Sequence, residues 1–508
     1  MDVPLPKIAF DNKKYIELQT QAILERAERF GNKLYLEVGG KLLQDFHAAR
    51  ILPGFDPDVK IRMLQTLKDK IDVLVCVYAR DIEQKRYRAD FKTTYDNEVL
   101  RTIDEVRKHG LNVRAVVMSR YEPTMSAAEN FAARLERSGI PVTKHSATVG
   151  YPDDVSRILS PEGYGLNPMV ETERPIVCVI APGPSSGKLA TCLTQLYHEN
   201  CRGGRAGYAK YETFPVWSLP LTHPVNIAYE SATADIKDFN QIDPFHLEAY
   251  GKTAVSYNRD VAAFPILREL LGRIMGGDAY KSPTDMGVNM IGYGIVDDDA
   301  VRYASHQEII RRMFHSSCNV TMGTADASEL QQQQHIMQTL QLRETDRPVV
   351  KPAREAATCA LETGKGFNGI CCGAALQLHD GRIVTGKNSR MLYAASSVIL
   401  NALKTLAEIP DWIHLLPENI TEAVNLMKGR HLGLHSSNMN VEELLIALSI
   451  SGLYNTAAKR AIEKLPELRG CDMHMTHITT PSDENGIRRL GIHLTTDPQH
   501  PSKELFVQ

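Results

Sequence analysis

The chain has 508 residues, of which 43% are hydrophobic and 23% are charged, and its 58 Lys and Arg nearly balance 61 Asp and Glu. A single core rarely grows beyond roughly 250–300 residues, so this length predicts several domains of a soluble globular protein. The charge balance and the absence of a basic run argue against a nucleic-acid binder. No stretch reaches the roughly 20 apolar residues of a membrane span, and nine scattered cysteines without C-x-x-C favour a reduced, cytoplasmic setting.

Strand-like and helix-like patterns alternate over the first 240 residues. Apolar runs at 34–38, 72–79, 113–118 and 176–180 are typical of buried strands, and helical patterns lie between them. Such alternation is typical of a doubly wound, mostly parallel sheet. We therefore expect an α/β fold whose first domain, residues 1–240, carries this sheet.

The strand signal fades after this domain. A mainly helical region is expected over 241–345, and a charged segment with two prolines, 343–352, is expected to link it to a third domain, 346–508. Two further strands are predicted to meet at a turn around Asp380-Gly381, before a helix that begins near Met391.

A second hairpin is expected near the end of the chain, between residues 474–479 and 488–494. Cys471, His474 and His477 suggest zinc, but 474 and 477 would point to opposite faces of a regular strand. No zinc is therefore expected there.

A glycine-rich turn follows the apolar run 176–180. Two serines lie between its glycines, a lysine follows, and an amphipathic helix comes next. Glycine lets backbone N–H groups approach a phosphate, and the helix start and the lysine add positive charge. The predicted contacts to a phosphorylated ligand are Gly183, Ser185, Ser186, Gly187, Lys188 and Thr191.

This turn resembles a P-loop, with two departures from G-x-x-x-x-G-K-[ST]. The interval between the glycines is one residue short, and Leu189 replaces the residue whose hydroxyl binds Mg²⁺. Ser185, Ser186 or Thr191 would have to supply that hydroxyl. The expected ligand is ATP or another nucleotide with Mg²⁺, or another phosphorylated small molecule; the alternative is an ordinary strand-to-helix turn with a solvated lysine. A weaker motif, Gly39-Gly40-Lys41, is interpreted as a structural turn.

Two later segments, 210–230 and 282–289, are dense in polar side chains beside prolines and aromatic residues. Such segments often form the walls of sites, although turns and helix caps use the same residue types. The candidate acids, bases or ligands are Glu212, His223, Asn226, Glu230 and Asp285, and catalytic roles are assigned to Glu212, His223, Glu230 and Asp285.

The stretch from Gly373 to about Leu406 resembles the opening hairpin and helix of the cytidine deaminase-like fold. Aligned on Tyr393, the position of the zinc ligand holds Val398 and that of the catalytic glutamate holds Leu400, and no P-C-x-x-C follows. The resemblance implies a deaminase-like α/β domain without a zinc site.

Longer motifs span the chain: VGGKLLQDFHAARILPGFDPD, IAPGPSSGKLA, KYETFPVWSLPLTHPVNIAYE and SPTDMGVNM. Together they resemble an uncharacterised bacterial family, domain of unknown function 1846. The resemblance implies a soluble bacterial protein with a three-part architecture, and it brings no reaction and no catalytic residues.

The sequence favours a cytoplasmic enzyme that binds a nucleotide or phosphometabolite, with ATP-dependent phosphoryl transfer as one reaction class. In that reaction a carboxylate such as Glu212, Glu230 or Asp285 would bind Mg²⁺ or act as a base. Two alternatives stay open: a non-catalytic regulatory protein for a phosphorylated ligand, and a hydrolase or transferase that uses an interdomain cleft without a nucleotide. The expected partner is a small phosphorylated molecule, without nucleic acid or membrane, and a homo-oligomer is compatible with the sequence.

Overall fold

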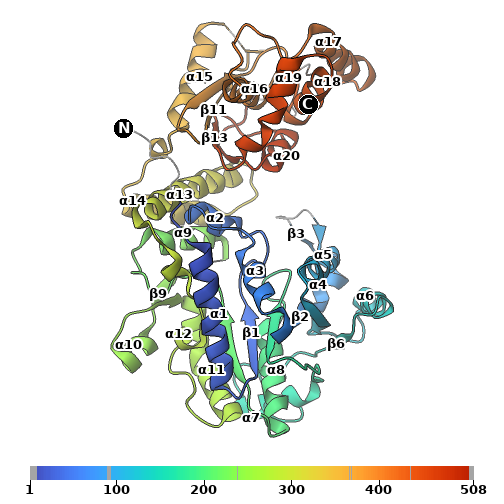
Figure 1. Ribbon diagram of the computed structural model, residues 1–508, viewed down its shortest axis with the longest axis vertical. Coiled ribbons are helices and arrows are strands. Elements are labelled where there is room, and N and C mark those ends of the chain that lie inside the picture. The colour runs from blue at the N-terminus through green and yellow to red at the C-terminus, as the bar shows by residue number, and fades with distance from the viewer. Residues whose placement is uncertain are drawn as a thin grey trace. The chain divides into compact units, whose positions relative to one another are not determined.

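The chain divides into two compact units in a computed structural model (Figure 1). The N-terminal unit is Ile8–Ser305, and the C-terminal unit begins at His306. Residues 241–305 belong to the first of these units, and the expected boundary at 345 lies inside the second. The structure describes residues 8–88, 93–236, 238–364, 366–367, 369–434, 436 and 438–502.

A six-stranded parallel sheet forms the centre of the N-terminal unit, which confirms the expected α/β class and parallel sheet. Its spatial order is β6-β5-β2-β7-β1-β8. Every residue of β1 and β7 is buried, as expected for strands covered on both faces. The strands are β1 (Leu34–Val38), β2 (Ile71–Tyr78), β5 (Asn112–Ser119), β6 (Val142–Lys144), β7 (Ile176–Ile180) and β8 (Gly207–Tyr211).

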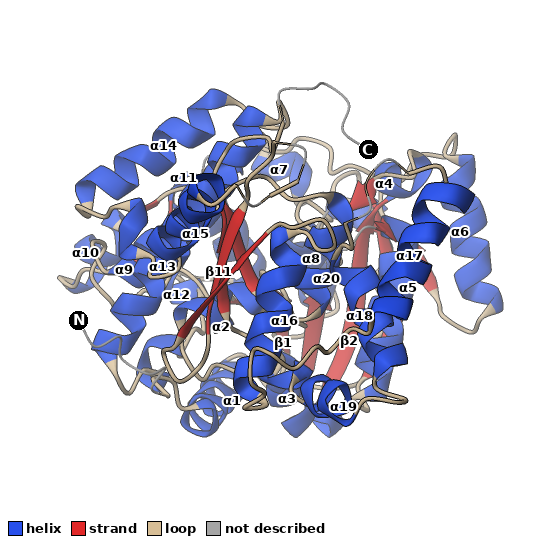
Figure 2. Cartoon of the chain, turned by 90° about the horizontal axis from the view of Figure 1, so that it is seen from above, coloured by secondary structure: helices blue, strands red, loops and turns tan. Residues whose placement is uncertain are grey.

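Helices and two small antiparallel strand pairs complete the N-terminal unit (Figure 2). The strand pairs are β3 (Tyr87–Arg88) with β4 (Thr93–Thr94), and β9 (Asn240–Ile242) with β10 (Val255–Tyr257). The helices are α1 (Asn12–Arg29), α2 (Phe46–Ile51), α3 (Val59–Thr66), α4 (Ala79–Glu83), α5 (Tyr95–Lys108), α6 (Ser126–Arg137), α7 (Val155–Ile158), α8 (Lys188–Cys201), α9 (Pro224–Ala232), α10 (Pro244–Tyr250), α11 (Asn258–Met275) and α12 (Pro283–Met286).

The connections of the large sheet run in two directions. The chain passes from β2 through α5 to β5 on one side, and from β7 through α8 to β8 on the other. Right-handed crossovers that run in opposite directions place their helices on opposite faces of a sheet. In agreement, α5 packs on β2 and β5, whereas α8 packs on β1, β7 and β8.

A mixed four-stranded sheet with the order β12-β11-β13-β14 forms the centre of the C-terminal unit. β11 is antiparallel to β12 and to β13, whereas β13 and β14 are parallel. The strands are β11 (Gly373–Gln377), β12 (Ile383–Lys387), β13 (Asp472–Met475) and β14 (His493–Thr496). The helices are α14 (Ala327–Thr339), α15 (Val350–Glu362), α16 (Ala394–Leu406), α17 (Glu418–Leu426), the π-helical segment η6 (Met427–His431), α18 (Val441–Ser451), α19 (Thr456–Glu463) and α20 (Pro481–Arg489), and α13 (Asp298–Thr321) contains the division between the units.

One of the two predicted hairpins of this unit is present and the other is absent. The turn at Asp380-Gly381 joins β11 and β12, and α16 begins at Ala394, close to the predicted start. The prediction of a second hairpin was wrong, because α20 separates the parallel strands β13 and β14. The residues between them start a helix: the Thr480 side chain accepts a hydrogen bond from the Asp483 amide at 3.2 Å, and Pro481 occupies the first turn.

The close packing of β11 against α15 can be tested by a substitution at Gly373. A Cβ there would lie 2.2 Å from the Ala353 carbonyl oxygen and 2.5 Å from the Ala357 amide nitrogen, both backbone atoms. Gly373→Ala should therefore lower the free energy of unfolding by about 1–3 kcal/mol. Urea unfolding followed by circular dichroism measures this, with Gly277→Ala as the control because its Cβ would meet open space. Equal stability of the two variants would contradict the packing.

Candidate functional site

A cleft of ≈ 990 Å³ opens at the carboxyl edge of the parallel sheet. The turns after β1, β5 and β7 line it, together with residues of β8 and α11. Neighbouring strands β2 and β7 lead into connections that leave in opposite directions. In open parallel sheets such a switch point is where ligands bind, and the volume lies within the roughly 300–1,000 Å³ of small-molecule sites.

The glycine-rich turn lies at this switch point and leads directly into α8. Gly187 takes a left-handed conformation with φ 88°, and α8 begins at Lys188. Ser185 is also left-handed, with φ 55°. The Ser186 hydroxyl donates to the Gly183 carbonyl at 2.8 Å and so closes the turn from within.

The end of β5 holds the turn in place. The Ser119 hydroxyl donates to the Ser186 carbonyl at 3.0 Å, and the Arg120 guanidinium donates to the Ser185 carbonyl. A Cβ on Gly187 would lie 2.6 Å from the Ser119 Cβ, so this position excludes a side chain. The turn is therefore a fixed part of the cleft wall.

The start of α8 presents backbone donors beside the cleft. Among the described residues, none accepts a hydrogen bond from the amides of residues 187–190, whereas the Thr191 amide bonds the Gly187 carbonyl at 2.9 Å. Free amides at a helix start favour an anion, and Lys188, which also lines the cleft, adds a full positive charge.

The hydroxyls predicted to bind Mg²⁺ have different surroundings. Ser185 is exposed at the cleft, but Ser186 is buried with its hydroxyl on the Gly183 carbonyl. Thr191 is also buried, and its hydroxyl accepts from the Cys76 thiol at 3.3 Å. Two of the three hydroxyls are thus engaged inside the protein.

A half-buried lysine lies between two carboxylates in the cleft. Lys210 Nζ on β8 lies 2.9 and 2.6 Å from the Asp260 carboxylate oxygens and 3.1 Å from Glu212 Oε2. Burial acts to lower the pKa of Lys210, but Glu212 and Asp260 outweigh it and hold that pKa above its ordinary value. Burial is the main cause that raises the pKa of Glu212, so this carboxyl holds a proton more tightly than an ordinary glutamate does.

A second pair of charges, Asp238 and Arg259, also lines the cleft. The Arg259 guanidinium donates to Asp238 Oδ2. The other oxygen, Oδ1, is buried and has no hydrogen-bond partner among the described residues. Burial raises the pKa of Asp238, against the opposing effect of Arg259. A buried carboxylate oxygen that lacks a donor is energetically costly.

The turn after β1 brings the backbone against Glu212. A Cβ on Gly39 would lie 2.0 Å from Glu212 Oε1 and 2.1 Å from its Cγ. Buried Lys60 lies behind the turn, with Nζ 3.2 Å from Asp45 and 3.5 Å from the Gly39 carbonyl. On β1 itself, Glu37 accepts a hydrogen bond from the Tyr208 hydroxyl at 2.7 Å. The turn at Gly39 therefore positions Glu212 as part of the site.

The structure brings only one of the four proposed catalytic residues into the cleft. Glu212 lines the cleft. His223, Glu230 and Asp285 are not among the described residues that line it. His223 caps α9 through the Val225 amide at 3.2 Å and bonds Asp298 at 2.9 Å, and Asp285 accepts from the Tyr250 hydroxyl at 2.7 Å. Glu230 Oε2 accepts from the Asn240 amide at 3.4 Å, and Asn226 holds both backbone groups of Val216.

Asp238, Arg259 and Asp260 were not predicted from the sequence as site residues. Arg259 and Asp260 are adjacent charges in the first turn of α11, one residue after the short buried strand β10, which is the one local signal that marks them. Nothing near Asp238 distinguishes it from a surface residue. The fold alone brings these side chains to Lys210 and Glu212.

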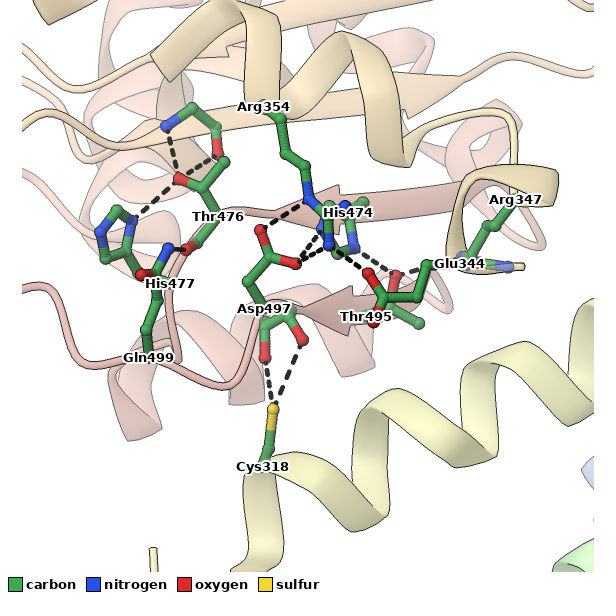
Figure 3. Close-up of polar contacts among 12 residues, drawn as sticks. Cys318, Glu344, Arg347, Arg354, His474, Thr476, His477, Thr495, Asp497 and Gln499 are labelled. Atoms are coloured by element: carbon green, nitrogen blue, oxygen red, sulfur yellow. Dashed lines mark hydrogen bonds and ion pairs between the residues drawn. The ribbon is translucent and has the colours of Figure 1, made fainter. Parts of the chain in front are cut away.

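A polar network in the C-terminal unit contains the histidines that suggested zinc (Figure 3). His474 is buried, with Nδ1 2.9 Å from the Thr495 hydroxyl and Nε2 3.3 Å from Asp497. Arg354 donates to both oxygens of Asp497, at 3.1 and 2.6 Å. Figure 3 shows the side chains of His474 and Arg354 directed at the Asp497 carboxylate. His477 bonds Thr476 instead. The network joins β13, β14 and α15.

No group of three or more His, Cys, Asp or Glu within the described ranges is arranged to hold a metal ion. Across those same ranges, no helix combines the length and the apolar character that a membrane crossing requires.

Two family models match the chain: domain of unknown function DUF1846, N-terminal, over residues 8–341, and its C-terminal counterpart over residues 345–506. The chain belongs to this family. It is 52% identical over 501 residues to a UPF0371 protein of Clostridium botulinum (strain Alaska E43 / Type E3). The matched region covers 98% of this chain and 99% of the relative. A UPF0371 protein of Clostridium tetani shows the same identity and coverage. The N-terminal family model contains every side chain of the cleft.

The contact between Gly39 and Glu212 can be tested by a double-mutant cycle. Gly39→Ala should lower the free energy of unfolding by about 1–3 kcal/mol, because its Cβ displaces the Glu212 side chain. Adding Glu212→Ala removes the overlap and should recover about 1 kcal/mol or more relative to the sum of the single changes. Urea unfolding of the four proteins gives this coupling, and strict additivity would show that the two residues do not touch.

Proposed function

We propose that the N-terminal cleft binds a phosphorylated small molecule and holds its phosphate on the turn Gly183–Lys188. The observation that supports this most directly is the position of that turn, which is fixed against Ser119 at the switch point, with the start of α8 beside the cleft. A phosphate there would meet the helix dipole, the amides of α8 and the charge of Lys188.

The other end of the cleft favours a ligand rich in hydroxyl groups. Carboxylates accept hydrogen bonds, and Asp238, Asp260 and Glu212 are among those that line the cleft. We therefore favour a sugar phosphate or a nucleotide, with the phosphate at α8 and the hydroxyls toward Lys210.

Glu212 is the best candidate for acid–base chemistry on such a ligand. Burial raises its pKa, so it is protonated over a wider pH range than an ordinary glutamate. The Lys210 ammonium, held beside it, would stabilise negative charge that develops on the ligand. The reaction class would be group transfer or hydrolysis at the phosphorylated molecule.

A non-catalytic binding role is the second candidate. Leu189 occupies the position of the Mg²⁺-binding hydroxyl residue, and the hydroxyls of Ser186 and Thr191 are engaged inside the protein. These features favour a turn that holds the phosphate of a substrate or regulator over a nucleotide site that depends on Mg²⁺.

A thermal-shift series tests the proposal. The full chain is heated with inorganic phosphate, sugar phosphates and nucleotides, each with and without Mg²⁺, and with the matching unphosphorylated sugars and nucleosides. Ligands that bind the folded state raise the melting temperature, and the rise grows with the logarithm of ligand concentration relative to Kd. Stabilisation only by phosphorylated compounds supports the proposal, and equal stabilisation by the unphosphorylated ones contradicts it.

Lys188→Ala tests the phosphate contact. Losing one charge-assisted contact costs about 1.5–3 kcal/mol, so the affinity for the best phosphorylated ligand of that series should fall roughly 10- to 150-fold. Isothermal titration measures the affinity. Lys459→Ala, an exposed lysine of the C-terminal unit, is the matched control. Unchanged binding by Lys188→Ala would mean that the turn has only a structural role.

Glu212→Gln separates catalysis from binding. If Glu212 acts as a general acid, turnover should fall by about 100-fold or more while the affinity changes little. Turnover of the parent should also decline as pH rises, because deprotonation of Glu212 removes the acid, and the variant should lose this dependence. Rates against pH for both proteins decide it, and full activity in the Gln variant would exclude this role.

A further inference from the structure

The C-terminal unit exposes large apolar side chains on two neighbouring helices. α17 continues into the π-helical segment as one rod from Glu418 to His431, and α18 packs against α17. Single exposed apolar residues are common, but a group of them on adjacent elements marks an interaction surface. We call this the α17–α18 surface, and its members are Leu426, Met427, Leu432, Ile446, Ile450, Leu453 and Tyr454.

These side chains are well exposed and the helices beneath them are fixed. Leu426 is 53% exposed and Ile446 is 62% exposed. Lys428 is buried between the helices, where its Nζ donates to Glu443 Oε2 at 2.8 Å and to the Asn438 carbonyl at 2.5 Å. Because Glu443 also closes the capping box of α18, the two helices are tied at their junction. A preformed surface loses little conformational entropy when it binds.

The outer stripe of the rod has a self-complementary pattern. Glu422, Leu426 and Arg430 follow at intervals of four residues and are all exposed. Small residues, Ala423 and Gly429, lie on either side of Leu426, and a Cβ on Gly429 would meet open space. Neither Glu422 nor Arg430 forms an ion pair with another described residue. On each side of Leu426, the third residue is small and the fourth is charged. The charge is negative on the N-terminal side and positive on the C-terminal side.

We propose that the α17–α18 surface is the interface of a symmetric homodimer, in which the rods of two protomers cross antiparallel at Leu426. In a two-fold contact residue i meets j and j meets i, so Glu422 would face Arg430 of the partner subunit, and this ion pair would form twice. The antiparallel arrangement also opposes the two helix dipoles. The small residues Ala423 and Gly429 let the two rods approach each other closely.

Charge reversal on the full chain tests this arrangement. Sedimentation equilibrium gives the dimer dissociation constant. Protein concentrations of roughly 1–100 μM bracket micromolar association. Glu422→Arg or Arg430→Glu alone places like charges opposite each other twice, and each should raise that constant about 10- to 100-fold. The double variant Glu422→Arg/Arg430→Glu restores opposite charges and should return the constant to within about threefold of the parent.

Two controls keep the result specific. Glu136→Arg reverses an exposed charge on α6, in the other unit, and should leave the constant unchanged. Circular dichroism of each variant shows whether the fold is kept, and recovery in the double variant excludes general misfolding. A monomeric parent overturns the proposal, whether or not it binds lipid vesicles or other proteins. So does a dimer that neither single reversal weakens, or a double variant that stays as weak as the single ones.

Discussion

The backbone at Gly187 lies so close to Ser119 that no side chain fits between them, and the position of the cleft depends on this contact. Ser119 ends β5, whereas Gly187 follows β7, and β2 lies between those strands. The turn after β7 must therefore extend across the end of β2 to reach Ser119. As a result, α8 starts over the switch point of the sheet, where its dipole and amides can act on a ligand.

Burial of charge explains most of the other polar contacts. A buried ion is costly unless a partner and hydrogen bonds compensate it. Lys60 accordingly lies beside Asp45, Lys210 beside Asp260 and Glu212, and Arg347 lies 3.0 Å from Asp472. Asp238 departs from this rule, because one of its oxygens has no donor among the described residues. Asp238 is one of the residues that line the N-terminal cleft.

The two units offer different kinds of surface. The N-terminal unit carries a cleft with charges of both signs, suited to a small polar ligand. The C-terminal unit pairs Arg354 and His474 internally with Asp497 and presents apolar helices outward, which suits contact with a macromolecule. The relatives from Clostridium cover 98% of the chain, so the two units occur together in them. The two proposals, ligand binding and assembly, therefore concern separate parts of one chain.

The sequence by itself determined the features that arise from neighbouring residues. The apolar runs at β1 and β7 predicted buried strands, the Gly183–Lys188 pattern predicted a turn before a helix, and Asp380-Gly381 predicted a hairpin, because each depends on local periodicity or turn chemistry. The prediction of a second hairpin was wrong because it also depended on local patterns alone. Its strand patterns were local, but their parallel pairing depends on α20 between them.

Only the tertiary structure decided which side chains share the cleft. Asp238 precedes β9, and Arg259 and Asp260 lie in the first turn of α11. All three are far along the chain from Glu37 and Lys188, and no spacing in the sequence relates them. His223, in contrast, had the residue type and the setting of a catalytic base, yet it caps α9. A polar residue acquires its role from the partners that chain crossovers bring to it, and those partners are set by long-range packing that local sequence patterns do not encode.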